Sequence, residues 1–148
     1  MANFSEEINS KFPNDKVKAF LNIIYTANWI NSKQNAFFKP FGLSPQQYNI
    51  LRILRGAKLP LKVQTIKERM IERSPNVTRL MDKLIDKQLI ERIACPNDRR
   101  VVHISITDQG LELLKTIDTH DDQHDFLNNL TETEGTQLSN LLDKIRSV

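Results

Sequence analysis

Apolar residues recur at steps of three and four along two stretches near the start of the chain, a spacing that favours amphipathic helices. Residues 15–38 form the first stretch, which is apolar over much of its predicted surface. The second begins at Ser44, which can cap a helix together with Gln47 in a capping box, and continues to about Lys58. The pattern therefore predicts two consecutive helices in this part of the chain.

Helical spacing returns further along the chain. A short helix is predicted over residues 64–71, after a very short strand or extended link at residues 61–63. A second Ser-Pro pair, Ser74-Pro75, predicts the start of the next helix. The apolar residues of that helix form a single stripe: Val77, Leu80, Met81, Leu84 and Ile85. These two helices and the turn between them are a predicted helix-turn-helix.

Two stretches then alternate between apolar and polar residues, which is the pattern of strands. They cover residues 89–95 and 101–107, and the segment PNDRR between them predicts a hairpin. A hairpin directly after a helix-turn-helix is a wing.

The C-terminal part of the chain is again helical in pattern. Thr107 can cap a helix whose predicted inner face consists of Leu111, Leu114 and Ile117. The pattern allows this helix to continue through the polar run DTHDDQHD to about Leu130. Thr131 can then cap a last helix, whose apolar stripe is Leu138, Leu141, Leu142 and Ile145.

The predicted fold is mainly α with a small β wing, an α+β winged helix-turn-helix flanked by helices. The length of 148 residues fits a single domain. Residues 43–108 are its predicted winged helix-turn-helix part, and residues 1–42 and 109–148 its predicted helical dimerisation part. The first and last helices carry more apolar surface than one small domain can cover, which usually marks an interface.

Charge is divided unevenly along the chain. Residues 1–100 hold 18 Lys and Arg against nine Asp and Glu, whereas residues 101–148 hold three against nine. A basic body suggests an anionic partner, and nucleic acid is the commonest such partner.

The composition argues against several other classes of protein. No apolar run approaches the ~18 residues of a membrane span, and the first residues lack the basic start and apolar stretch of a secretory signal. Cys95 is the only cysteine, which excludes an internal disulfide and fits a reducing, cytoplasmic setting. No motif supplies a nucleophile with its base or a three-ligand catalytic site, so we expect neither enzymatic activity nor a cofactor.

The outward residues of the helix that starts at Ser74 are of the types that recognise DNA. A helix fits the major groove, where Arg can bind guanine and Asn adenine, while hydroxyl groups suit phosphates. The arginines at the wing tip would enter a minor groove, with Asp98 holding the loop in shape. The candidate DNA-binding residues are Ser74, Asn76, Thr78, Arg79, Lys83, Asp98, Arg99 and Arg100. For the helix alone, a solvated polar face is the alternative.

These motifs resemble the multiple-antibiotic-resistance regulators (MarR family), which are bacterial winged-helix transcription factors. The resemblance covers roughly residues 43–114 and includes LSPQQYNIL, IKERMIERSPNVTRLMDKL, LIER, PNDRR and ITDQG at the family's spacing. It implies a homodimer with intertwined terminal helices that binds a pseudo-palindromic operator in double-stranded DNA, as a repressor. Gln88 stands where the family often has Gly, which costs up to ~1 kcal/mol if the backbone there is left-handed.

The resemblance also implies a small aromatic effector, bound between the dimer helices and the DNA-binding heads. The candidate ligand-binding residues are Tyr25, Trp29, Phe37 and Tyr48. Aromatic residues at helical spacing suit a core or a dimer interface equally well, and this alternative stays open.

Three other interpretations remain. His120 and His124 have the i, i+4 spacing of metal ligands on one helix face, although a hydrated helical stretch explains them as well. Cys95 could sense oxidants, with three arginines nearby in sequence, or simply end a strand. The winged helix could also serve as a protein-interaction module without DNA.

Overall fold

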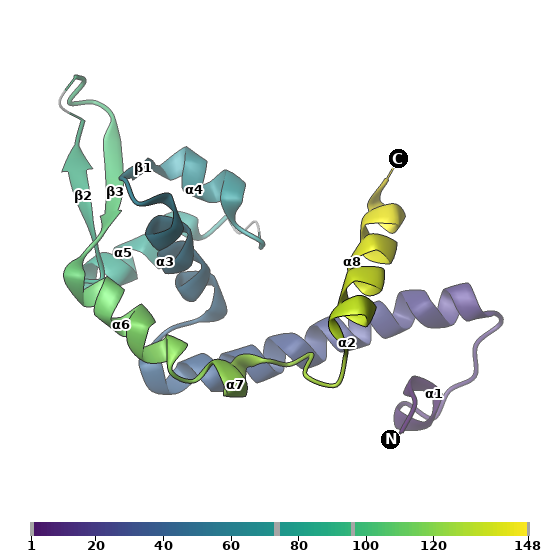
Figure 1. Ribbon diagram of the computed structural model, residues 1–148. Coiled ribbons are helices and arrows are strands. Elements are labelled where there is room, and N and C mark those ends of the chain that lie inside the picture. The colour runs from purple at the N-terminus through teal and green to yellow at the C-terminus, as the bar shows by residue number, and fades with distance from the viewer. Residues whose placement is uncertain (1, 73–74, 96, 148) are drawn as a thin grey trace.

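The computed structural model describes residues 2–72, 75–95 and 97–147. Its elements in chain order are α1 (Phe4–Glu7), α2 (Asp15–Phe38), η1 (Lys39–Phe41), α3 (Pro45–Ala57), β1 (Leu61–Lys62), α4 (Val63–Arg69), α5 (Val77–Asp86), β2 (Ile90–Ala94), β3 (Val102–Ile106), α6 (Asp108–Asp118), α7 (Asp121–His124) and α8 (Glu132–Arg146). Figure 1 shows α2 as a long helix that leaves a compact winged head, from which the β2–β3 hairpin projects.

The predicted fold class is confirmed: helices surround a three-stranded antiparallel sheet with strand order β1-β3-β2. The segment after α3 is a short strand, in which Leu61 lies opposite Ile104 of β3. β2 pairs with β3 along its whole length, from Ile90 to Ala94. The predicted hairpin is therefore the wing, and β1 ties its inner strand to the helices of the head.

Side-chain caps begin three helices where the sequence predicts them. In α3, Ser44 Oγ accepts a hydrogen bond from the Gln47 backbone N–H at 3.1 Å, and Gln47 Oε1 accepts from the Ser44 N–H at 3.0 Å. Thr107 Oγ1 accepts from the Gly110 N–H at 3.1 Å at the start of α6, and Thr131 caps α8 in the same way. Each such cap stabilises its helix by about 1 kcal/mol.

One hydrophobic core holds the head together. Its buried side chains come from α2 to α6 and from all three strands: Phe38, Leu43, Ile50, Leu51, Leu54, Leu61, Ile66, Met70, Val77, Met81, Leu84, Leu89, Ile90, Ile104, Leu114 and Ile117. Burying each large apolar side chain contributes roughly 1.5–3 kcal/mol. The predicted inward stripe of α5 belongs to this core, with Leu80 and Ile85 partly buried at its edge.

The helix after the second Ser-Pro pair, α5, begins later than that pair predicts. α5 starts at Val77, with Asn76 as its N-cap. At the first Ser-Pro pair, Gln47 completes the capping box three residues after Ser44, whereas the corresponding residue after Ser74 is Val77, which has no acceptor. Ser74 itself lies outside the described residues.

The helix that begins after Thr107 does not continue to Leu130, contrary to what its pattern allows. α6 ends at Asp118, α7 is a single turn, and α8 begins only at Glu132. Acidic residues crowd the region just after α6, where the negative end of the helix dipole disfavours them. The chain therefore turns at this point.

The inner face of α6 is also rotated from the prediction. Leu111 is 39% exposed, whereas Leu113 is partly buried against the core beside Leu114. A Cβ at Gly110 would lie 2.3 Å from the carbonyl oxygen of Leu89, so only glycine lets the first turn of α6 pack on the backbone at the base of the wing.

α2 and α8 leave large apolar side chains exposed along their length: Phe20, Ile23, Ile24, Tyr25, Trp29, Leu138, Leu141 and Ile145. Phe20 is 61% exposed and Ile145 is 64% exposed. The head core thus leaves these two helices largely uncovered. Among the described residues, no helix combines the length and the apolar character needed to cross a membrane.

Candidate nucleic-acid interface

The recognition helix α5 divides into a buried face and an exposed face. Val77, Met81 and Leu84 are buried in the core, whereas Thr78, Arg79 and Lys83 are exposed, as is the N-cap Asn76. The sequence-predicted contact residues within the described range therefore share the solvent side of one helix. Arg and Asn side chains on such a surface can bond to base edges.

The tip of the wing is shaped by Asp98. Its Oδ1 accepts a hydrogen bond from the Arg100 backbone N–H at 3.0 Å, and its carbonyl accepts from the Val101 N–H at 3.0 Å. The Arg100 side chain is 95% exposed, with Nε 3.8 Å from the Asp98 carboxylate. Asp98 thus closes the turn while the arginine extends into solvent, and Arg99 is exposed beside it.

An ion pair joins the recognition helix to the wing. A guanidinium nitrogen of Arg92 on β2 lies 2.6 Å from the carboxylate of Asp82 on α5. The prediction from sequence missed this pair, although Asp82 is an acidic residue on the outward face of α5, next to the basic Lys83. Because both partners are about half exposed, its role is to orient α5 and β2 rather than to add much stability.

The turn after α5 has the left-handed backbone that glycine would favour. Gln88 has φ of 63°, and its carbonyl accepts a hydrogen bond from Thr107 Oγ1 at 2.7 Å. The Leu89 N–H donates to the Leu84 carbonyl at 3.0 Å. Tertiary hydrogen bonds therefore hold a strained residue where the recognition helix meets the wing.

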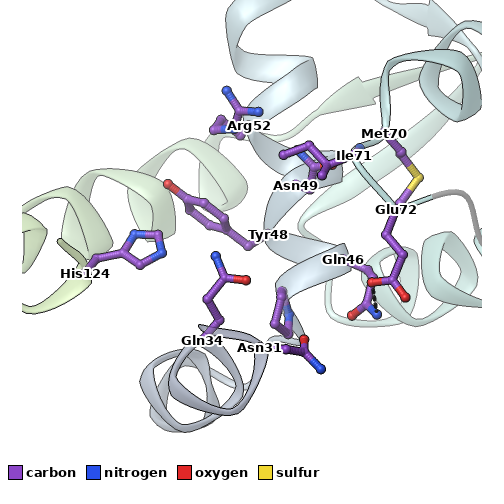
Figure 2. A pocket seen from close by; sticks show the side chains of 11 residues that line it. Asn31, Gln34, Gln46, Tyr48, Asn49, Arg52, Met70, Ile71, Glu72 and His124 are labelled. Carbon is purple, nitrogen blue, oxygen red and sulfur yellow. Dashed lines mark hydrogen bonds between the residues drawn. The ribbon is translucent and has the colours of Figure 1, made fainter. Parts of the chain in front are cut away.

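A second site is a pocket of about 270 Å³ between α2, α3, the segment after α4 and α7. Tyr48, Asn49, Arg52 and His124 contribute polar atoms to it, as Figure 2 shows. Asn49 Oδ1 accepts from the Ile71 N–H at 3.0 Å, whereas its buried Nδ2 has no hydrogen-bond partner among the described residues. The pocket thus contains a buried donor that a ligand acceptor could satisfy.

Only one of the four predicted ligand-binding aromatics lines this pocket, namely Tyr48. The Phe37 ring stacks on the ring of His124, a pocket residue, with their centroids 4.7 Å apart, but Phe37 does not itself line the pocket. Tyr25 packs on Phe4 at 5.2 Å, and Trp29 is exposed on α2 with Lys33 over its ring.

His124 was missed as a pocket residue because it lies in an acidic run that is typical of a hydrated helix. The structure places its ring among Phe37, Phe38, Tyr48 and Phe126, with centroids 4.7–5.7 Å away. Burial lowers the pKa of His124, against an opposing effect of Asp121. Burial, followed by the Asp118 carboxylate, raises the pKa of Tyr48, so both rings are neutral near pH 7.

The metal and redox interpretations receive no geometric support. His120 contacts Phe41 at 5.6 Å, and within residues 2–72, 75–95 and 97–147 no three His, Cys, Asp or Glu side chains are grouped to hold a metal ion. Cys95 is partly buried at the end of β2, where its N–H donates to the Val101 carbonyl at 3.0 Å.

The fold and this surface define a winged helix-turn-helix protein, a class that binds DNA. The sequence matches the MarR family over residues 43–102, from the residue before Ser44 to the first residue of β3. The chain belongs to the MarR family of transcriptional regulators.

Relatives of known name agree with this assignment. HTH-type transcriptional regulator MhqR of Bacillus subtilis is 29% identical, over 87% of this chain and 90% of its own length. A MarR transcription factor from Planctomyces limnophilus is 33% identical with a TM-score of 0.66, over 90% of this chain and 98% of that one. A mutant MarR from E. coli complexed with operator DNA is 25% identical with a TM-score of 0.77, over 93% of this chain and 100% of that one.

Proposed function

We propose that the protein is a homodimeric repressor that binds a pseudo-palindromic operator, with α5 in the major groove and the wing tip in an adjacent minor groove. One observation carries this proposal: α5, which the Asp82–Arg92 ion pair joins to the wing strand β2, and the wing tip together present Arg79, Lys83 and Arg100 to solvent. The operator DNA bound by the E. coli relative supports it. Such a protein works in the bacterial cytoplasm, where promoters are accessible.

The candidate residues fall into groups with different proposed roles. Arg79 and Asn76 read base edges, because their side chains match guanine and adenine. Thr78, Lys83 and Ser74 contact bases or nearby phosphates. Arg99 and Arg100 enter the minor groove, where the concentrated negative potential offsets their mutual repulsion, and Asp98 shapes the loop that carries them.

The dimer would use the apolar faces of α2 and α8. Phe20 and Leu141 are each about 60% exposed, and monomers rarely leave contiguous apolar patches of this extent in water. A two-fold dimer would set its two recognition helices about one DNA turn apart, ~34 Å.

The pocket at Tyr48 is the proposed effector site. Its volume of about 270 Å³ suits a single-ring compound, and Tyr48, Asn49 and Arg52 offer hydrogen-bond donors around it. The pocket lies where the head meets α2 and α7, so a bound ligand can favour one spacing of the two heads over another. A ligand that binds more tightly to a dimer whose head spacing does not fit DNA would weaken DNA binding, to the extent that its affinities for the two dimer conformations differ.

Fluorescence anisotropy of a labelled mixed-sequence duplex tests the proposal, with sedimentation velocity giving the mass of the free protein. We expect a dimer that binds DNA with strong salt dependence. A protein-interaction module would instead show no affinity for any duplex at low salt, and reversing the charge of Arg79 or Arg100 would leave its activity in cells unchanged.

A further inference from the structure

A notch beside the recognition helix collects three lysines. It has a volume of about 480 Å³ and lies between the end of α2, the start of α3 and one flank of α5. We call it the lysine notch, after its residues Lys39, Lys83 and Lys87. Within the part of the chain that the structure describes, no acidic side chain lines the notch, so the charge of its lysines is uncompensated there.

Two features hold the notch in shape. Gly42 has φ of 71°, which turns its carbonyl toward Lys87, and Lys87 Nζ donates a hydrogen bond to that oxygen. An ammonium group has three N–H donors, so two remain for another acceptor. This lysine is therefore an anchored cation rather than a freely rotating one.

Gln47 adds a further donor to the same place. The residue is 5% exposed, and its Oε1 is occupied by the Ser44 N–H in the capping box. Because the residue lines the notch, its amide Nε2 is a second kind of N–H donor beside the lysines. An anionic oxygen in the notch can accept from this amide and meet the three ammonium groups.

The position of the notch on α5 indicates what binds there. Lys83 and Lys87 follow one flank of α5 at i, i+4 spacing, whereas Asp82, which holds the wing, lies 100° away around the helix. A recognition helix in the major groove has a phosphate strand on each side. The wing is tied to the flank that carries Asp82, and the lysine notch lies along a different flank of α5.

We propose that the lysine notch binds a backbone phosphate of the operator on the side of α5 away from the wing. This inference rests on the proposed function and adds Lys39, Lys87 and Gln47 to the DNA-contacting residues. The contact is independent of base sequence and fixes how deeply the helix sits in the groove.

The test compares Lys39→Gln, Lys87→Gln and the double variant with wild type and with Lys16→Gln, an exposed lysine of α2 far from the head. For the double variant we expect the slope of log K against log salt to fall by about one unit, so that its affinity drops about 3.5-fold less than that of wild type when salt is raised fourfold. Lys16→Gln should keep the wild-type slope. Lys39→Gln leaves the Lys87–Gly42 hydrogen bond intact, so it separates a DNA effect from a folding effect.

Duplexes with a single neutral methylphosphonate locate the contact. One position should weaken wild type but leave the double variant unaffected. An unchanged salt slope and no such position would overturn the proposal while leaving DNA binding itself intact; absence of DNA binding by wild type would overturn both. A third outcome is that the free protein binds inorganic phosphate, that the variants lose this binding, and that the DNA salt slope is unchanged. The notch would then be a site for free phosphate, and the proposal that it binds an operator phosphate would be wrong.

Discussion

Arg92 on the wing strand β2 lies 2.6 Å from Asp82 on α5, which ties together two elements of the proposed DNA-binding surface. The pair is about half exposed, so its loss should cost no more than about 1 kcal/mol of stability. We therefore expect the ion pair to matter mainly for the orientation of the wing relative to α5.

We expect Asp82→Arg and Arg92→Asp each to weaken operator binding, and the double swap to recover most of it. The single variants leave two like charges facing each other, whereas the swap restores an attractive pair. Titration of one duplex with all four proteins gives the coupling energy. Additive losses in the double swap would mean that the two residues act independently on DNA.

Arg100→Ala should weaken binding to every duplex and lower the salt slope by about one unit, as expected for the loss of one phosphate or minor-groove contact. The side chain is 95% exposed, so the thermal midpoint should not change. If the salt slope stays at its wild-type value, the wing tip does not contact DNA.

Arg79→Ala and Asn76→Ala should relax preference at particular base pairs, at ~1–3 kcal/mol each. Both residues lie at the exposed N-terminal end of α5, the part of a recognition helix that reaches base edges. Affinities for a set of single-base operator variants show the effect. A uniform loss across all sequences would instead make these two residues phosphate binders.

Gly110→Ala should destabilise the fold by about 2–4 kcal/mol, because the new Cβ would lie 2.3 Å from the Leu89 carbonyl and force the base of the wing to shift. Gly56→Ala is the matched control, since nothing lies within 4 Å of its added Cβ and alanine favours a helix by about 0.5–1 kcal/mol. Urea unfolding measures both changes. If Gly110→Ala left the unfolding free energy unchanged, or changed it no differently from Gly56→Ala, α6 would not pack on this backbone.

Acid should weaken the fold through His124. Burial lowers its pKa in the folded state, so the unfolded chain binds a proton more readily. This part of the stability is complete above the ordinary histidine pKa of about 6.5 and is lost as pH falls from there toward the folded-state value. In His124→Phe, which keeps the ring packing, unfolding free energies at pH 7.5 and 5.5 should differ less than in wild type. An identical pH dependence in His124→Phe and wild type would show that His124 does not contribute to the loss of stability in acid.

The sequence predicts features whose cause is local. Ser44 with Gln47, Thr107 and Thr131 start helices because their side chains bond to backbone N–H groups within the next turn. The stripe of α5 and the alternation of the wing follow from burying one face of each element. These patterns are sufficient to place Asn76, Thr78, Arg79 and Lys83 on the exposed side of α5.

Features that depend on distant contacts were not predictable in this way. His124 joins the aromatic rings of Phe37 and Tyr48, more than 70 residues earlier in the chain, and no local pattern distinguishes it from its acidic neighbours. Gln88 adopts a left-handed backbone because tertiary hydrogen bonds such as that from Thr107 hold it there. Tyr25 packs on α1 through Phe4, a contact that helical spacing alone does not specify.

Selecting bound duplexes from a random pool with the purified protein tests the central claim most directly. The account predicts enrichment of an inverted repeat with half-site centres about 10 base pairs apart, one per chain of a dimer. A pool that stays random after repeated selection at low salt, or an enriched single site bound by one chain, would contradict it.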